Sequence, residues 1–186
     1  MLPPDFISVV SAQTWHMLHR KGLGAEHPLN DRVQAMFMVV FLGVWALDSF
    51  IFRFSTVLAG AVPLVIRLLL AVLSFVAGIY LAGKSEAAVF GRTLVGRTGE
   101  SKFITTGVYG WVRHPMYLGS LLVLLGFFFT TLSLLSLVVW VGLFAFINRM
   151  AAYEEQDLIR ILGIEYLDYQ KQVPKWFPHV RRERTV

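Results

Sequence analysis

Gly107-Val-Tyr-Gly-Trp-Val-Arg-His-Pro-Met-Tyr-Leu-Gly119 stands between a polar, basic loop and a long apolar run. Its Arg113, His114 and Tyr117 place a fixed cation, a titratable ring and a phenol at the start of that run. Pro115 suits the first turn of a helix, where its missing N–H costs no hydrogen bond. The free N–H groups of a helix that begins here point back at the loop and favour an anion. The stretch therefore predicts a polar pocket at the boundary between water and lipid, although Arg and His before an apolar helix also serve as plain interfacial anchors.

The composition indicates a membrane protein of one domain. Hydrophobic residues make up 56% of the 186 residues and charged residues 16%, against about a quarter charged in a soluble domain. A soluble core of this size cannot bury so much apolar surface. The chain has no cysteine, which excludes disulfides and thiolate chemistry. Residues 1–10 hold an aspartate and two prolines and lack the basic start of a cleavable signal peptide.

Four apolar runs have about the length needed to cross a bilayer: Val33–Phe52, Leu58–Leu81, Met116–Thr131 and Leu134–Met150. Only Leu132-Ser133 separates the last two runs, so they predict a tight helical hairpin. The predicted fold class is all-α, a polytopic membrane protein with about four transmembrane helices. Residues 1–186 are expected to form one membrane domain. We expect an N-terminal interfacial segment (1–32), two spans (33–81), a cytoplasmic cofactor loop (82–115), a helical hairpin (116–150), and a cytoplasmic C-terminal helix with a basic tail (151–186).

Two charged residues interrupt the apolar runs. Asp48 lies in the first run and Arg67 in the second. A charge inside a membrane is expensive and faces a partner or water. Because Arg67 can extend along the helix towards the surface, the two side chains are predicted to form a pair. Snorkelling of each side chain to the surface is the alternative.

The polar segments argue against nucleotide and metal sites. Glycines at 91, 96 and 99 match neither the dinucleotide fingerprint nor the P-loop, so residues 83–106 are interpreted as a flexible or re-entrant loop. His16 and His19 lie three residues apart, which gives too few ligands for a metal. No metal site is expected.

The positions of the basic residues predict the topology. With four spans, the N-terminal segment, the 83–113 loop and the C-terminal tail lie on one side of the membrane. Of the 17 Lys and Arg residues, only Arg53 and Arg67 lie elsewhere. The positive-inside rule makes the basic side cytoplasmic, with both termini. The net charge of +5 is thereby explained without nucleic acid as a partner.

This topology brings two polar groups of residues together. Arg113, His114 and Tyr117 begin the third span, and Arg149 with the pair Glu154-Glu155 follows the fourth span on the same side. A carboxylate pair beside a cation and a histidine is a candidate site. The alternative is a solvated helix start without a function.

The sequence resembles a known superfamily, the isoprenylcysteine carboxyl methyltransferases and phospholipid methyltransferases. The resemblance covers roughly residues 90–178 and rests on the stretch Gly107–Gly119, on Glu154-Glu155, and on Leu162-Gly163, Glu165-Tyr166, Tyr169 and Val173-Pro174. It implies an integral membrane enzyme that uses S-adenosylmethionine without a Rossmann fold.

The resemblance also implies roles for individual residues. Cofactor binding falls on Lys102, Phe103, Ile104, Tyr109, His114, Pro115, Met116, Tyr117 and Glu154, with Glu154 holding the amino-acid end of the cofactor. The family has a substrate-binding arginine four residues before that glutamate. Here Met150 occupies that position and Arg149 is one residue early, which rotates the side chain by about 100° on a helix. Arg149 is expected to bind and orient the substrate carboxylate, and Glu155 or His114 to act as the base if the acceptor is an amine.

The resemblance therefore implies a methyltransferase that acts on a lipophilic or prenylated acceptor, with isoprenylcysteine-type carboxyl O-methylation as the first choice. Phospholipid N-methylation is the alternative within the superfamily. An NADPH-dependent membrane sterol-type reductase and a non-enzymatic scaffold are more distant alternatives. The expected partners are the acceptor and membrane lipids, with the active site facing the cytoplasm.

Overall fold

The computed structural model describes residues 30–95 and 104–177. Most of these residues are helical, and no strand is among them. The long helices are α2 (Asn30–Ala46), α3 (Leu64–Val95), α4 (Pro115–Thr131) and α5 (Leu134–Leu162). The shorter elements are η1 (Leu47–Phe52), η2 (Val57–Gly60), η4 (Gly107–Gly110) and α6 (Ile164–Gln172). The predicted all-α class is confirmed.

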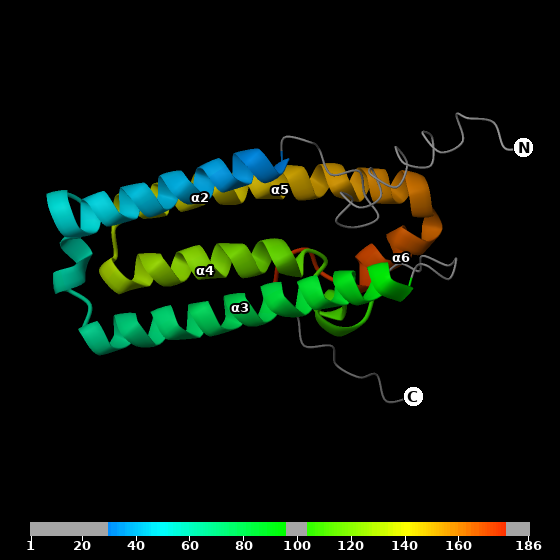
Figure 1. Ribbon diagram of the computed structural model, residues 1–186, viewed down its shortest axis with the longest axis horizontal. Helices are drawn as coiled ribbons and strands as arrows, with labels where there is room; N and C mark the ends of the chain where they lie inside the picture. The colour runs from blue at the N-terminus through cyan, green and yellow to red at the C-terminus, as the bar shows by residue number, and fades with distance from the viewer. Residues whose placement is uncertain (1–29, 96–103, 178–186) are drawn as a thin grey trace, which may run out of the picture.

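The four long helices form an elongated bundle (Figure 1). α2 packs along α5, α3 packs along α4, and α4 lies between α3 and the other pair. α6 lies at the end where α4 begins and α5 ends. α2 with η1, α3 and α5 are long and apolar enough to cross a membrane, and α4 is a shorter apolar helix. Apolar side chains cover the exposed faces of α2 and α3, as expected for helices that face lipid.

Glycines let α3 and α4 approach each other closely. A Cβ on Gly119 would lie 2.8 Å from the backbone nitrogen of Ala82, and one on Gly78 would lie 2.7 Å from the carbonyl oxygen of Gly119. The ring of Phe75 fills the space beside Gly126. Small residues that admit a neighbouring backbone are typical of helix pairs in membranes. The α3–α4 contact is therefore the closest in the bundle.

The predicted hairpin is present. α4 ends at Thr131 and α5 begins at Leu134. Leu132 adopts a left-handed conformation (φ 55°), and the Ser133 hydroxyl accepts a hydrogen bond from the Ser136 backbone N–H. These two residues form the whole turn, because one reverses the chain and the other caps the next helix.

The predicted pair of Asp48 and Arg67 is wrong. The buried Asp48 carboxylate accepts hydrogen bonds from the Ser55 backbone N–H (3.0 Å) and from the Ser133 hydroxyl (2.6 Å). Arg67 instead donates from Nη1 to the Thr130 carbonyl oxygen at 3.2 Å. The hydrogen-bond donors to the Asp48 carboxylate come from Ser55 and Ser133. Asp48 therefore links the α2–α3 connection, which holds Ser55, to the α4–α5 turn, which holds Ser133.

Helix boundaries differ from the sequence-based expectation at two places. α3 begins at Leu64 and continues to Val95, so residues 83–95 are helical and not part of a loop. Lys, Glu and Ala in this part have high helix propensity, which sustains the helix beyond the apolar run. α5 continues to Leu162, and Gly163 (φ 58°) separates it from α6, so the expected single C-terminal helix is divided. The predictions for residues 1–29 and 178–186 lie outside the described residues.

Candidate functional site

The segment before α4 is shaped by its glycines and Pro115. Gly107 has a φ of 64°, a conformation that strains other residues, and it begins the short helix η4. His114 precedes α4 with non-helical backbone angles (φ −122°, ψ 62°), and Pro115 occupies the first turn as predicted. This geometry brings the His114 and Tyr117 side chains to the last turns of α5.

Five side chains from the two segments form a compact cluster. His114 Nε2 lies 3.0 Å from Glu155 Oε1, and its Nδ1 lies 3.7 Å from Glu154 Oε2. Arg113 Nε donates to Glu155 Oε1 at 2.9 Å. The Tyr117 hydroxyl donates to Glu154. The structure therefore brings Arg113, His114, Tyr117 and the carboxylate pair together, as the hairpin argument predicts.

The two carboxylates have opposite electrostatics, and both lie beyond the apolar residues 134–150 of α5. Burial raises the pKa of Glu154, which the Tyr117 hydrogen bond and His114 only partly offset. Burial acts on Glu155 as well, but hydrogen bonds and charge from His114 and Arg113 hold its pKa below the usual range. Glu155 is therefore an ionised acceptor, so His114 Nε2 donates to it. Glu154 is a largely shielded carboxyl, with 13% of its side-chain surface exposed, and a cation would stabilise its ionised form.

Arg113 fixes α6 and the residues after it against the cluster. Besides Glu155, its Nη1 donates to the carbonyl oxygens of Gln170 (3.1 Å) and Val173 (2.9 Å). Its backbone N–H donates to the Pro174 carbonyl oxygen at 2.9 Å. Arg113 is therefore a positioning residue that holds the chain after α6 against the cluster.

Residues 173–176 follow α6 and lie over the cluster. The Trp176 ring lies 5.8 Å from the His114 ring and 5.6 Å from the Phe144 ring, centroid to centroid. Its Nε1 donates to Asn148 Oδ1 at 2.9 Å, and Lys175 Nζ donates to the Asn148 carbonyl oxygen at 3.0 Å. We call Val173–Trp176 the C-terminal strap. It covers His114 with an aromatic ring.

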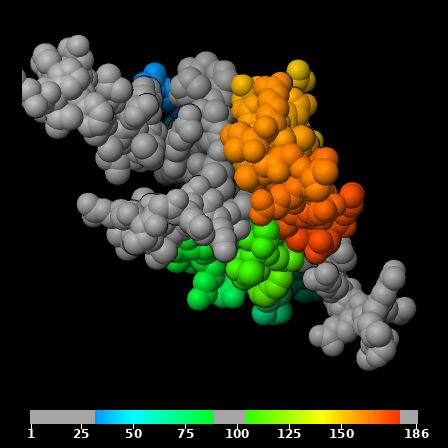
Figure 2. All heavy atoms as spheres, turned by 90° about the vertical axis from the view of Figure 1, so that its right-hand side faces the viewer, coloured from blue at the N-terminus to red at the C-terminus, as the bar shows by residue number. Residues whose placement is uncertain are grey.

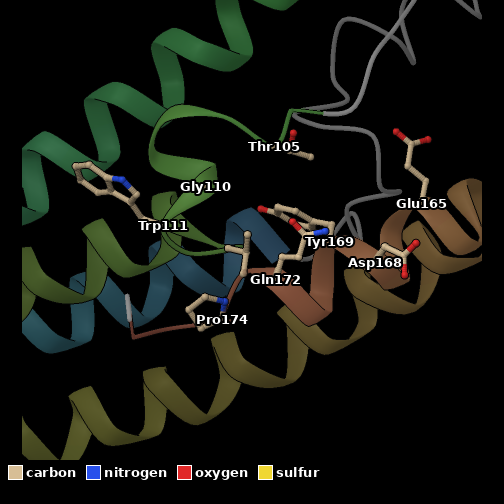
Figure 3. Close-up of a pocket in the computed structure, with 9 residues that line it drawn as sticks. Thr105, Gly110, Trp111, Glu165, Asp168, Tyr169, Gln172 and Pro174 are labelled. Carbon is tan, nitrogen blue, oxygen red and sulfur yellow. The ribbon is translucent and has the colours of Figure 1, made fainter. Parts of the chain in front are cut away.

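A cavity of about 340 Å³ lies beside the cluster, between the segment that precedes α4 and α6 (Figure 3). Figure 3 shows Trp111 at one end, Glu165 at the other and Tyr169 between them. The Tyr169 hydroxyl donates to the Tyr109 carbonyl oxygen at 2.6 Å, which joins the two walls. The cavity is lined by Thr105, Gly110, Trp111, Glu165, Asp168, Tyr169, Gln172, Val173 and Pro174. In Figure 2 the same end of the molecule shows α6 and the last turns of α5 beside the 104–114 segment.

The other predicted site residues fall into three groups. Pro115 is buried, while Ile104, Tyr109 and Met116 are half-buried. Burial raises the pKa of Tyr109, which the Ser85 hydrogen bond only partly offsets. Lys102 and Phe103 lie outside the described residues. Arg149 is exposed, and its roles stay predictions.

The sequence argument missed several residues that shape the site. Asn148, Lys175 and Trp176 are among them, and Gln170 donates to Glu155 Oε2 at 3.3 Å. Only Val173-Pro174 was part of the recognised pattern. An aromatic residue beside lysine in a basic tail resembles an interfacial anchor, so nothing local in the sequence marks Trp176.

Comparison with known proteins supports the resemblance. The sequence profile described as "Phospholipid methyltransferase" matches residues 56–164, more than half of the chain. No solved structure is significantly similar to the chain.

Curated relatives are about a third identical to the chain over the aligned segments. The protein-S-isoprenylcysteine O-methyltransferase of Schizosaccharomyces pombe is 36% identical over 88 residues, which cover 44% of this chain and 35% of that protein. The mouse (Mus musculus) protein of the same name is 35% identical over 79 residues, or 42% of this chain and 28% of the mouse protein.

A third relative is named for a different activity. The methanethiol S-methyltransferase of Crocosphaera subtropica is 34% identical over 83 residues, or 44% of this chain and 31% of that protein. The chain thus matches about a third of the length of each of these relatives. The family profile, in contrast, spans α3, α4 and α5 completely, the last two of which carry the paired carboxylates and Tyr117. The chain belongs to the phospholipid methyltransferase family.

Proposed function

We propose that the protein is an integral membrane methyltransferase that transfers a methyl group from S-adenosylmethionine to the carboxylate of a lipophilic, isoprenylcysteine-type acceptor. The observation that carries this proposal is the unequal carboxylate pair. Glu155 is held ionised by Arg113 and His114, whereas Glu154 is buried and its pKa is raised. Within the described residues, no Lys or Arg nitrogen lies within 4.0 Å of Glu154.

The cluster fits the charge of the proposed donor. S-adenosylmethionine carries an ammonium and a sulfonium, so it suits a buried carboxyl that lacks a cation. Glu154 would hold the ammonium, and Tyr117 fixes the orientation of that carboxyl by its hydrogen bond. Tyr109 and Ile104 would add to the binding surface, as would Pro115 and Met116. Lys102 and Phe103 are proposed for the same surface.

Positioning is the main contribution of these residues to catalysis. When bound, the donor supplies a methyl group that passes to the acceptor oxygen, while the carbon–sulfur bond breaks and the sulfonium becomes a neutral thioether. Alignment of two reactants is worth up to about 7–11 kcal/mol in model reactions. Glu154 fixes one reactant, and His114, held between Glu155 and the Trp176 ring, forms the adjoining wall. A carboxylate acceptor is already ionised at neutral pH, so neither His114 nor Glu155 has to remove a proton.

The names of the relatives favour a carboxylate acceptor. Two of them are isoprenylcysteine O-methyltransferases, and these matches include about two fifths of this chain. The apolar faces of the bundle suit an acceptor that arrives from the membrane. Arg149, which is exposed on α5, is the residue that the family resemblance favours for binding the acceptor.

The name of the family, phospholipid methyltransferase, favours a second candidate function, N-methylation of a phospholipid amine. An amine acceptor must lose a proton before or during transfer. Glu155 or His114 would then act as the base.

A transfer assay separates these candidates. The purified protein in lipid nanodiscs receives S-adenosylmethionine with a tritiated methyl group, together with N-acetyl-S-farnesylcysteine or phosphatidylethanolamine. We expect label in the farnesylcysteine product, released as methanol by mild base, because methyl esters hydrolyse and N-methyl groups do not. Base-stable label in the phospholipid would favour the second candidate. Absence of transfer to both acceptors would contradict the proposal.

A further inference from the structure

Three of the cations near the cluster are paired with acceptors. Arg113 binds Glu155 and two carbonyl oxygens. Arg160 pairs with Asp157 at 3.2 Å, and Lys171 pairs with Asp168 at 2.8 Å. Lys175 differs from them. Among the described side chains, no carboxylate oxygen lies within 4.0 Å of its Nζ.

The C-terminal strap holds Lys175 in a defined place. The strap is tied on one side by Arg113, which binds the carbonyl oxygens of Val173 and Pro174. On the other side, Lys175 Nζ and Trp176 Nε1 donate to the backbone and the side chain of Asn148. The Nζ lies 5.6 Å from the centre of the Trp176 ring, whose neighbour is His114. The ammonium is therefore placed next to the wall of the proposed site.

Among the described side chains, no anion is in direct contact with Lys175. Burial, together with the charge of Arg113, lowers the pKa of Lys175, and the carboxylates of Glu155 and Glu154 only partly offset this. An ammonium has three N–H donors, and one of them is used on the Asn148 carbonyl oxygen. A bound carboxylate would accept from the ammonium and restore its usual affinity for a proton.

An anionic acceptor needs such a group. Glu154 and Glu155 repel a carboxylate that approaches His114, so a cation has to offset their charge. The Nε and Nη1 groups of Arg113 already donate to Glu155 and to the carbonyl oxygens of Gln170 and Val173. Arg149 lies on an exposed part of α5. Lys175 is half-buried and belongs to the segment that covers His114.

We infer that Lys175, presented by the C-terminal strap, binds the carboxylate of the methyl acceptor. This inference rests on the proposed function and deepens it, because it commits the acceptor to an anionic group. The neighbouring rings of Trp176, Phe144 and Trp140 form a row, with Trp140 stacked 5.8 Å from Phe144. The row leads from Lys175 along the apolar part of α5 and offers a surface to the apolar part of the acceptor.

Calorimetric titration of two ligands tests the inference without turnover. N-acetyl-S-farnesylcysteine carries the carboxylate, and its carboxamide has the same shape without the charge. The full-length protein in nanodiscs should prefer the carboxylate, and Lys175→Gln should lower the affinity for it by about 10- to 100-fold, the usual effect of losing one charge-assisted hydrogen bond. Affinity for the carboxamide and for S-adenosylmethionine should stay within about twofold. Lys175→Arg should restore most of the preference.

Two variants serve as matched controls. Lys171→Gln removes the same charge from an exposed lysine four residues earlier. It should not change the affinity for the carboxylate, the carboxamide or S-adenosylmethionine. Arg149→Gln tests the residue that the sequence resemblance favours. If Arg149→Gln removes the preference for the carboxylate and Lys175→Gln does not, the inference is wrong and Arg149 has the role. If Lys175→Gln weakens both ligands and S-adenosylmethionine alike and Lys175→Arg does not rescue them, Lys175 only supports the fold, which also overturns the inference.

The methyl-transfer assay distinguishes this failure from failure of the proposed function. A wild-type protein that transfers no methyl group contradicts the proposed function, whatever the titrations give. A wild-type protein that methylates the farnesylcysteine, with the same KM in Lys175→Gln, contradicts only the role of Lys175.

Discussion

Glu154 and Glu155 are adjacent on α5, yet their surroundings shift their pKa values in opposite directions. The side chains are similarly shielded, with 13% and 11% of their surface exposed. The difference arises from partners, because Glu155 receives Arg113 and His114 while Glu154 has a tyrosine hydroxyl and a more distant imidazole nitrogen. Glu155 is therefore expected to stabilise the fold, whereas Glu154 is the carboxyl that we propose binds a ligand.

Substitution of each carboxylate by its amide should separate these roles. Glu155→Gln strands the Arg113 charge, and we expect a loss of about 3 kcal/mol in the free energy of unfolding at pH 7. Glu154→Gln removes a buried carboxyl whose ionisation is unfavourable, so unfolding stability should be unchanged or higher. Thermal melts in one detergent would compare the two variants with the parent. Equal losses in both would contradict the assigned roles.

The pH dependence of the same variants follows from the signs of the shifts. The folded pKa of Glu155 lies below its unfolded value, so its stabilisation is present above about pH 4.5 and is lost as the pH falls through the folded pKa. The difference in melting temperature between the parent and Glu155→Gln should therefore be smaller at pH 4 than at pH 7. Melts across this range provide the check, and a difference that grows towards acid would have the wrong sign.

At the scale of the helices, the contact between α3 and α4 places the start of α4 and hence His114. Gly119 lies one turn after His114 and touches the α3 backbone. The atoms nearest to an added Cβ on Gly119 belong to the α3 backbone, so no change of a neighbouring side-chain rotamer would make room for it.

Gly119→Ala should thus lower the stability of the bundle. The added Cβ would lie 2.8 Å from backbone atoms of Gly78 and Ala82, and we expect a cost of about 1–3 kcal/mol in thermal or denaturant unfolding. Gly43→Ala is the matched control, since nothing lies within 4 Å of the added Cβ on α2. Equal stabilities for these two alanine variants would show that the close approach is not important.

The sequence predicts some of these features and not others, for identifiable reasons. Length and hydropathy are local, so the spans, the turn at Leu132-Ser133 and the meeting of His114 with Glu155 could be predicted. The partners of Asp48 could not, because they depend on how Ser55 and Ser133 fold back at the ends of two connections. The strap over His114 depends on Gly163, whose positive φ redirects the chain into α6.

At the scale of the whole molecule, the two polar clusters lie at opposite ends of the bundle (Figure 1). Asp48 with its hydroxyl partners lies where α4 turns into α5, and the carboxylate pair lies where α5 approaches α6. The distribution of Lys and Arg along the sequence predicts that the second end faces the cytoplasm. A polar donor would then enter from the cytosol, while the acceptor arrives through the bilayer.

Thiol labelling can test this orientation, because the chain has no cysteine of its own. Single cysteines at the exposed positions Thr105 and Lys171 should be protected in intact cells from a membrane-impermeant maleimide, and one at Ala61 should react. Permeabilised cells provide the control, in which all three should react. Reaction at Lys171 from outside would reverse the topology.

The central claim is that the cluster around Glu154 binds S-adenosylmethionine, and calorimetric titration of the donor tests it most directly. The parent protein should bind S-adenosylmethionine and not NADPH. Glu154→Gln retains the size and the melting temperature, so its affinity for the donor should fall by about 10- to 100-fold through loss of one charge-assisted contact. Unchanged affinity in Glu154→Gln, or binding of NADPH in place of S-adenosylmethionine, would contradict the account.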